Sequence, residues 1–162
     1  LGVPVYFYEA AARSPDRRPL ENVRRGGFEH PDHLPDLGGP ALHPTAGATV
    51  IGARNLLIAF NVDLDTTDLS IARAIARKIR ASSGGLAALK AMGVPLASRN
   101  LVQVSMNLTD FRQTSLREAY EAVRREASAL GAKIAGTQIV GMVPEKAAVD
   151  CDFVPPGQIL KI

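Results

Sequence analysis

Amide and hydroxyl side chains alternate with apolar ones in the segment LVQVSMNLTD, residues 101–110. Successive side chains of a strand point to opposite faces, so Gln103, Ser105 and Asn107 would share one face. Asn61 places a further amide within the apolar segment LIAFNVDL. A row of neutral hydrogen-bonding groups suits a polar, planar ligand held in a groove or channel. The alternative is a polar sheet face that simply lies in water.

The glycine-rich segment GGPALHPTAG, residues 38–47, is a second chemical signal because it has no Asp, Glu, Lys or Arg. Such a loop allows backbone amides to come close to a ligand. The alternative is a structural crossover that needs glycine for a positive φ. Arg54 follows in an otherwise apolar run, where it could meet an anionic group of a substrate or form a surface ion pair.

The three histidines give a weaker signal. His30 and His33 lie three residues apart among acidic residues, which could be drawn as a metal site. Pro31 and Pro35 make a turn-rich linker the preferred interpretation, and we predict no metal. His43 lies inside the glycine-rich segment, where it could touch a ligand, but we expect no catalytic duty for it.

Composition limits the classes of partner. The chain has 162 residues, of which 46% are hydrophobic, enough for a substantial core. The net charge of +3 is spread along the chain and aromatic residues make up 5%, which argues against nucleic acid and fits a small anionic ligand. No apolar run is long enough to span a membrane. Cys151 is the single cysteine, which excludes an intrachain disulfide and favours a reducing compartment.

Apolar spacing and capping signals predict an α+β fold. From residue 48 onward the elements run strand, helix, strand, helix, strand, with room for an extra strand, which fits a ferredoxin-like β-α-β-β-α-β plan. Thr67 is the predicted cap of the first of these helices, and Ser115 opens a capping box at the second. We expect strands at 3–8, 49–53, 55–63, 101–109 and 133–143; helices at 19–26, 67–80 and 115–130; a short segment at 86–93; a helical turn from 144; and an irregular tail from 152.

Six sequence blocks together resemble one known family more specifically than any single block. They resemble the formiminotransferase domain of the glutamate formimidoyltransferases, which also occurs in formimidoyltransferase-cyclodeaminases. The resemblance runs from residue 3 to about residue 150. The blocks are VPVYFYEAAA at 3–12, RRPLENVRRG at 17–26, PDLGGP at 35–40, HPTAGATVIGARNLLIAFNVDL at 43–64, QVSMNLTD at 103–110 and GTQIVGMVP at 136–144.

The resemblance implies two ferredoxin-like subdomains whose sheets face one another, with folate and the formimino donor in the channel between them. The chain would then hold one β-α-β-β-α-β subdomain plus the last strand and helix of a preceding similar subdomain. The implied division is 1–47 for the end of the N-terminal subdomain with its folate-binding loop, 48–150 for the C-terminal subdomain, and 151–162 for the tail.

The implied reaction transfers the formimino group from N-formimino-L-glutamate to tetrahydrofolate, in histidine degradation and one-carbon metabolism. Tetrahydrofolate is the implied co-substrate, no metal is required, and the protein would be cytoplasmic. The resemblance implies folate binding by Gly38, Gly39, Pro40, Ala41, Leu42, His43, Pro44, Thr45, Ala46 and Gly47. Candidates for the channel lining are Arg54, Asn61, Gln103, Ser105 and Asn107.

The catalytic histidine of the family would lie before the strand at 3–8, and neither His30, His33 nor His43 aligns with it. No catalytic residue is therefore assigned, and we expect this chain to supply folate binding and the channel wall. It would work as a homodimer or together with the missing N-terminal half. The alternatives are a non-catalytic folate-binding module, one half of a split transferase, or an interaction domain that has kept only the fold.

Overall fold

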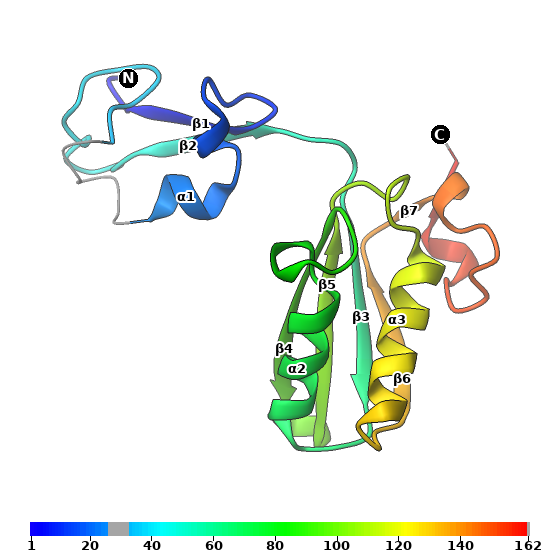
Figure 1. The fold of residues 1–162 in the computed structure, drawn as a ribbon. Helices are drawn as coiled ribbons and strands as arrows, with labels where there is room; N and C mark the ends of the chain where they lie inside the picture. Colours follow the sequence, from blue (N-terminus) through cyan, green and yellow to red (C-terminus); the bar gives the residue numbers. More distant parts are fainter. Residues whose placement is uncertain (26–32, 162) are drawn as a thin grey trace. The chain divides into compact units, whose positions relative to one another are not determined.

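The computed structural model describes residues 1–25 and 33–161, and it divides into two compact units (Figure 1). Unit 1 comprises Leu1–Arg54 and unit 2 comprises Asn55–Ile162. The division drawn from the sequence falls after Gly47. In the structure the following strand, β2 (Thr49–Ala53), pairs with the first strand of the chain and so belongs to unit 1.

Unit 1 is built on two parallel strands, β1 (Val5–Glu9) and β2. Helix α1 (Leu20–Arg24) follows a short 3-10 turn, and Tyr6 and Val23 are buried. The predicted first strand and first helix are therefore confirmed. Strand β2 has exposed side chains along most of its length, and a Cβ added to Gly52 would lie 2.5 Å from the ring of Tyr8 on β1.

A buried carboxylate fastens the loop of unit 1 to its first strand. The side chain of Asp36 is 3% exposed, and its Oδ2 accepts a hydrogen bond from the backbone N–H of Phe7 at 2.7 Å. Arg17 donates from Nη1 to the same oxygen at 3.2 Å and from Nη2 to the carbonyl of Leu34 at 2.8 Å. Both ends of this guanidinium are thus used to hold the loop in place.

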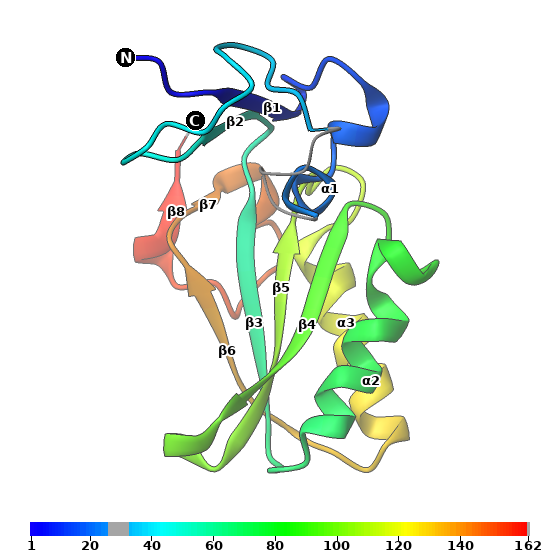
Figure 2. The same ribbon diagram turned by 90° about the vertical axis from the view of Figure 1, so that its left-hand side faces the viewer.

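Unit 2 contains a four-stranded sheet in the order β4-β5-β3-β6, in which all neighbours are antiparallel. Two helices, α2 and α3, cover one face of this sheet (Figure 2). The α+β class is therefore as expected, and the extra strand is β4. The elements are β3 (Ile58–Leu64), α2 (Leu69–Ile79), β4 (Leu89–Leu96), β5 (Leu101–Leu108), α3 (Leu116–Ala129) and β6 (Ile134–Val140).

Apolar side chains from alternate positions of the strands form the core of unit 2 beneath the helices. Along β3 and β5 the residues at even positions are all buried, which confirms the alternation predicted for the second of these strands. Gly93 on β4 allows α2 to pack closely, because an added Cβ would lie 2.6 Å from the backbone nitrogen of Arg73. The core residues of the two strands are Ile58, Phe60, Val62, Leu64, Val102, Val104, Met106 and Leu108.

The helix boundaries show one correction and one confirmation. Thr67 does not cap α2: the cap is Asp68, whose Oδ1 accepts a hydrogen bond from the N–H of Ser70 at 2.8 Å. Hydrogen bonding with Ser70 lowers the pKa of the Asp68 carboxyl. Ser115 caps α3 as predicted, because its Oγ accepts from the N–H of Glu118 at 3.1 Å. Gly131 follows the end of this helix with φ +73°.

The tail that the sequence suggested to be irregular contains short regular elements and packs on the core. Phe153 stacks on Phe60 and on Tyr120, with centroid distances of 5.2 and 4.9 Å. The side-chain amide of Gln158 donates to the carbonyls of Ile139 and Gly141 at 2.9 and 3.0 Å. A 3-10 turn leads into β8 (Ile159–Leu160), which pairs with β7 (Val143–Pro144). A second 3-10 turn, at Glu145–Ala147, confirms the helical turn predicted to begin at Pro144.

Candidate functional site

The predicted polar side chains lie on the sheet face of unit 2 that is opposite α2 and α3, which we call the open face. Strand register places Asn61 of β3 opposite Ser105 of β5 on one side and opposite Gln138 of β6 on the other. An amide, a hydroxyl and a second amide therefore form a row across three strands. Gln138 was not singled out from the sequence, although it stands in the same alternating pattern within GTQIV.

Burial on the open face decreases along β5. Gln103 is 7% exposed, Ser105 is half-buried and Asn107 is exposed, while Asn61 on the central strand is 8% exposed. The Nδ2 group of Asn61 donates to Oε1 of Gln138 at 3.4 Å, which is long for a hydrogen bond. The two amides therefore keep capacity to bind a ligand that offers shorter hydrogen bonds.

Apolar side chains border this polar row on the outer strands. Met92 of β4 pairs in register with Ser105, and Val140 of β6 pairs with Ala59. Both Met92 and Val140 are exposed. Met92 and Val140 thus offer apolar contacts beside the polar row, a combination that suits a planar ligand whose rim carries hydrogen-bonding groups.

A charged cluster lies further along the open face, at the end of β3. The side chain of Asp63 is 4% exposed, and its Oδ1 accepts a hydrogen bond from Nε2 of Gln103 at 2.8 Å. Its Oδ2 forms an ion pair with Nη1 of Arg99 at 2.8 Å. Sequence reasoning missed Asp63 and Arg99; the available signal was a carboxylate two positions after Asn61, on the same face of the strand.

The glycine-rich loop of unit 1 is held by bonds within itself. His43 and Gly47 exchange backbone hydrogen bonds at 2.9 Å in both directions. The Nδ1 atom of His43 accepts from the N–H groups of Thr45 and Ala46 at 3.3 and 3.1 Å. The Nδ1 atom of His43 is therefore engaged by the backbone of its own loop.

Two glycines of that loop have a structural reason to be glycine. Gly38 has φ +88°, and an added Cβ would lie 3.1 Å from Cα of Pro4. Gly47 has φ +64°. A conformation in the left-handed region is strained for other residues, so the structural interpretation of these glycines is supported. The role of the loop in binding folate stays a prediction.

The predicted site residues fall in both units. Asn61, Gln103, Ser105 and Asn107 share the open face of unit 2, whereas the loop 38–47 and the exposed Arg54 belong to unit 1.

Only part of the histidine cluster falls within the described residues. His30 lies outside the described residues, and the backbone carbonyl of His33 accepts the hydroxyl of Tyr6 at 2.9 Å. Among residues 1–25 and 33–161 no group of three His, Cys, Asp or Glu side chains is arranged to hold a metal ion. Within the same ranges no helix has the length and apolar character needed to cross a membrane.

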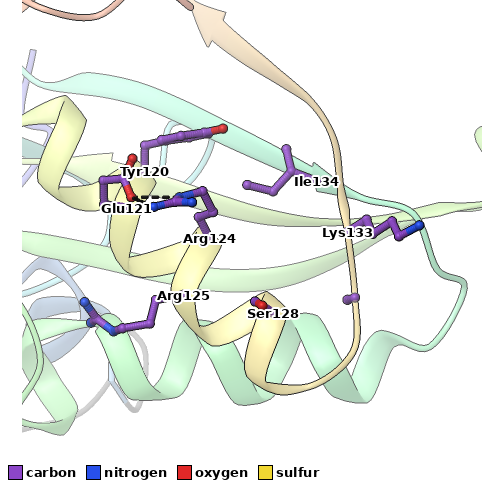
Figure 3. A pocket seen from close by; sticks show the side chains of 8 residues that line it. Tyr120, Glu121, Arg124, Arg125, Ser128, Lys133 and Ile134 are labelled. Atoms are coloured by element: carbon purple, nitrogen blue, oxygen red, sulfur yellow. Dashed lines mark hydrogen bonds and ion pairs between the residues drawn. The ribbon is translucent and has the colours of Figure 1, made fainter.

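A separate hollow lies beside α3 and the start of β6 (Figure 3). Glu121 holds Arg124 through contacts of 2.7 and 2.6 Å, and Arg125 and Lys133 point away from each other. The cationic groups therefore do not converge on one ligand. The hollow is lined by Tyr120, Glu121, Arg124, Arg125, Ser128, Ala132, Lys133 and Ile134.

An antiparallel sheet with two helices on one face and a row of polar side chains on the other defines an α+β domain. Residues 59–154 match the formiminotransferase domain, and residues 1–54 match the N-terminal subdomain of the formiminotransferase domain. The chain belongs to the formiminotransferase domain family. The match to the N-terminal subdomain ends at residue 54, which is also where unit 1 ends.

Several curated relatives carry names that agree with this family. The chain is 43% identical over 157 residues to a glutamate formimidoyltransferase of Streptococcus pyogenes serotype M1, covering 93% of this chain and 52% of that protein. It is 43% identical over 159 residues to a glutamate formimidoyltransferase of Thermoplasma acidophilum, with the same coverage. A formimidoyltransferase-cyclodeaminase of Gallus gallus is 43% identical over 163 residues, covering 93% of this chain and 30% of that protein. The chain thus spans about half the length of the first two relatives.

Proposed function

We propose that this chain supplies the folate-binding part and the channel wall of a glutamate formimidoyltransferase. The complete protein would transfer the formimino group of N-formimino-L-glutamate to tetrahydrofolate during histidine degradation. The observation that carries the proposal is the row of neutral amide and hydroxyl groups across the open face, with the buried Asn61 at its centre, within a chain of the formiminotransferase domain family.

In this proposal unit 2 is a ferredoxin-like β-α-β-β-α-β subdomain, and unit 1 holds the last strand and helix of a preceding similar subdomain. The strand order β4-β5-β3-β6 supports the first part, because the two central strands are the first and third in chain order within the unit. The protein would be cytoplasmic and would act as a homodimer or with an N-terminal half. The open face would then form one wall of the channel, and the loop 38–47 would contact folate.

The chemistry asks mainly for positioning. Transfer joins a folate nitrogen to the formimino carbon and releases glutamate, so holding both reactants in one geometry supplies much of the rate enhancement. Asn61, Ser105 and Gln138 offer donors and acceptors for the polar rim of the folate ring. We assign no base to His43, because its Nδ1 is occupied by two amides of its own loop.

Calorimetric titration of the 162-residue chain with tetrahydrofolate under reducing conditions tests the proposal. We expect saturable binding that Asn61→Val weakens by at least about tenfold, because a ligand hydrogen bond is lost in a buried site. Ser70→Ala, at an exposed position of α2, is the matched control and should bind as the wild type does. No saturable binding by the wild-type chain would contradict the folate assignment and favour an interaction domain.

A transfer assay separates the remaining alternatives. The chain is mixed with N-formimino-L-glutamate and tetrahydrofolate, with and without the separately expressed N-terminal half of the Streptococcus pyogenes relative. We expect 5-formiminotetrahydrofolate only when that half is present. Turnover by the chain alone would overturn the division of roles, and binding without turnover in either mixture would favour a non-catalytic folate-binding module.

A further inference from the structure

Arg99 differs from every side chain of the polar row because it brings a positive charge to the open face. It ends the 3-10 turn Ala97–Arg99, which joins β4 to β5. Its side chain is 55% exposed, although Nη1 lies 2.8 Å from the nearly buried carboxylate of Asp63. One nitrogen of the guanidinium is thus fixed by the protein, while more than half of the side chain is exposed to solvent.

The fixed end makes the exposed end of Arg99 a prepared binding group. A guanidinium carries five N–H donors in a rigid plane, so an ion pair at one nitrogen also orients the others. Gln103 donates to the second oxygen of Asp63 at 2.8 Å, which fixes the carboxylate in turn. An arginine that is already ordered loses less side-chain entropy when a ligand binds than a free surface arginine does.

We propose that Arg99 binds a carboxylate of a glutamyl group on the open face, and that Asp63 is its positioning residue. This inference rests on the proposed function, in which both tetrahydrofolate and N-formimino-L-glutamate carry a glutamyl group. The planar fork of arginine matches the two oxygens of a carboxylate. The Asp63–Arg99 pair has no net charge and its neighbours Gln103 and Ser105 are neutral, so the cluster suits a single carboxylate better than a multiply charged phosphate.

The first test compares ligands with and without the glutamyl group. The wild-type chain, Arg99→Ala and Arg99→Lys are titrated with tetrahydrofolate, with tetrahydropteroate and with N-formimino-L-glutamate. Arg99→Ala should lose at least about tenfold in affinity for one glutamyl ligand and none for tetrahydropteroate, as expected for a charged hydrogen bond. Arg99→Lys should restore only part of the affinity, because an ammonium lacks the fork.

The pattern of losses identifies the source of the carboxylate. A loss confined to tetrahydrofolate assigns the folate tail to Arg99, and a loss confined to N-formimino-L-glutamate assigns the donor. Arg77→Ala, at an exposed position of α2, is the control and should leave all affinities unchanged. Equal affinities of wild type and Arg99→Ala for both glutamyl ligands would overturn the assignment.

A double-mutant cycle tests the role of Asp63. Asp63→Asn keeps an oxygen for Gln103 but removes the charge that holds Arg99, so it should weaken the same ligand by about three- to tenfold. If Asp63 acts through Arg99, the double variant should bind no more weakly than Arg99→Ala alone. Additive losses would show that Asp63 acts by another route and would overturn its positioning role.

Failure of this inference is distinguishable from failure of the proposed function. If wild-type protein binds neither tetrahydrofolate nor tetrahydropteroate, the folate assignment fails. If it binds both and Arg99→Ala alters no glutamyl ligand, the proposed function stands and only the Arg99 assignment fails. Thermal unfolding of each variant is measured alongside. If Arg99→Ala does not fold, Arg99→Gln replaces it, because glutamine keeps most of the side-chain volume.

Discussion

Each unit of this chain contains a nearly buried aspartate paired with an arginine. The two pairs differ in the further contacts that the arginine makes. In unit 1, Arg17 contacts Asp36 with one nitrogen and the carbonyl of Leu34 with another. In unit 2, Arg99 contacts Asp63 with one nitrogen, and among the described residues it has no second ion pair. The carboxylates are equally hidden, at 3% and 4% exposure.

The difference separates a structural pair from the pair for which we propose a binding role. Asp36 also accepts a hydrogen bond from the backbone N–H of Phe7, so it links its own loop to the backbone of β1. Asp63 is held by a side-chain amide and in turn holds an exposed guanidinium. Burial of a carboxylate alone therefore says little about its role. The number of N–H groups that the paired arginine leaves exposed to solvent is more informative. The following predictions test this comparison.

Asp36→Ala should have the largest effect on stability. Removing the carboxylate leaves the N–H of Phe7 and the guanidinium of Arg17 without their acceptor, and breaking a buried pair costs roughly 3 kcal/mol or more. Denaturant unfolding measures the loss, and hydrogen exchange at Phe7 locates it in β1. Asp152→Ala, with a side chain that is 93% exposed, is the control. Equal stability of the two variants would contradict a structural role for Asp36.

Gly93→Ala should cause the next largest loss of stability, and Gly52→Ala should cause a smaller one. The added Cβ at Gly93 meets backbone of α2 at 2.6 Å, whereas at Gly52 it meets the side-chain ring of Tyr8 at 2.5 Å. Overpacking against backbone costs about 2 kcal/mol, because the helix itself must shift. Thermal unfolding of both variants checks the order. A larger loss at Gly52 would mean that unit 1 is the more rigidly packed unit at these positions.

Asp63→Asn should cost about 1 kcal/mol of stability, well below the cost of Asp36→Ala, since an acceptor for Gln103 remains and Arg99 can extend into water. The matched comparison is Asp36→Asn, which keeps an acceptor for Phe7 in the same way. Urea unfolding of both variants gives the difference. A loss at Asp63 as large as that at Asp36 would make the second pair structural as well.

Glu126→Gln should have the smallest effect on stability, and this effect should depend on pH. The Nζ atom of Lys78 on α2 lies 2.6 Å from Oε2 of Glu126 on α3, and this contact lowers the pKa of the Glu126 carboxyl. A lowered pKa in the folded state stabilises the protein above the ordinary glutamate pKa, and this contribution is lost as the pH falls through the lowered value. Lys78 is largely exposed, so solvent screening limits the contribution to about 0.5 kcal/mol. The stability difference between wild type and Glu126→Gln should therefore shrink on acidification; a constant difference would contradict the ion pair.

Local sequence signals predicted much of unit 2. The alternation around Gln103 and Ser105 indicated both the strand and its two faces, and Ser115 marked the start of α3 because capping depends on neighbouring residues alone. The same signal was ambiguous at α2, where Thr67 and Asp68 are adjacent and both able to cap. Where β4 lies, the sequence predicted only a short segment at 86–93. Gly93 and Pro95 interrupt the side-chain pattern that indicates a strand.

The charged part of the candidate site needed the tertiary structure. Asp63 and Arg99 are far apart in sequence, and their contact depends on the register that places Asp63 opposite Gln103. Sequence reasoning selected Arg54 instead, because it stands in an otherwise apolar run after the glycine-rich loop. The amides of that loop looked free for a ligand in the sequence, whereas His43 uses two of them, a contact set by backbone conformation.

The stacking of Phe153 between Phe60 and Tyr120 gives unit 2 an optical signal of its own. The chain has no tryptophan and three tyrosines, of which Tyr6 and Tyr8 lie in unit 1. Tyr120 is thus the only tyrosine in unit 2, and it lies 4.9 Å from the ring of Phe153. The near-ultraviolet difference spectrum between wild type and Tyr120→Phe therefore isolates the packing of the C-terminal tail, without any added label.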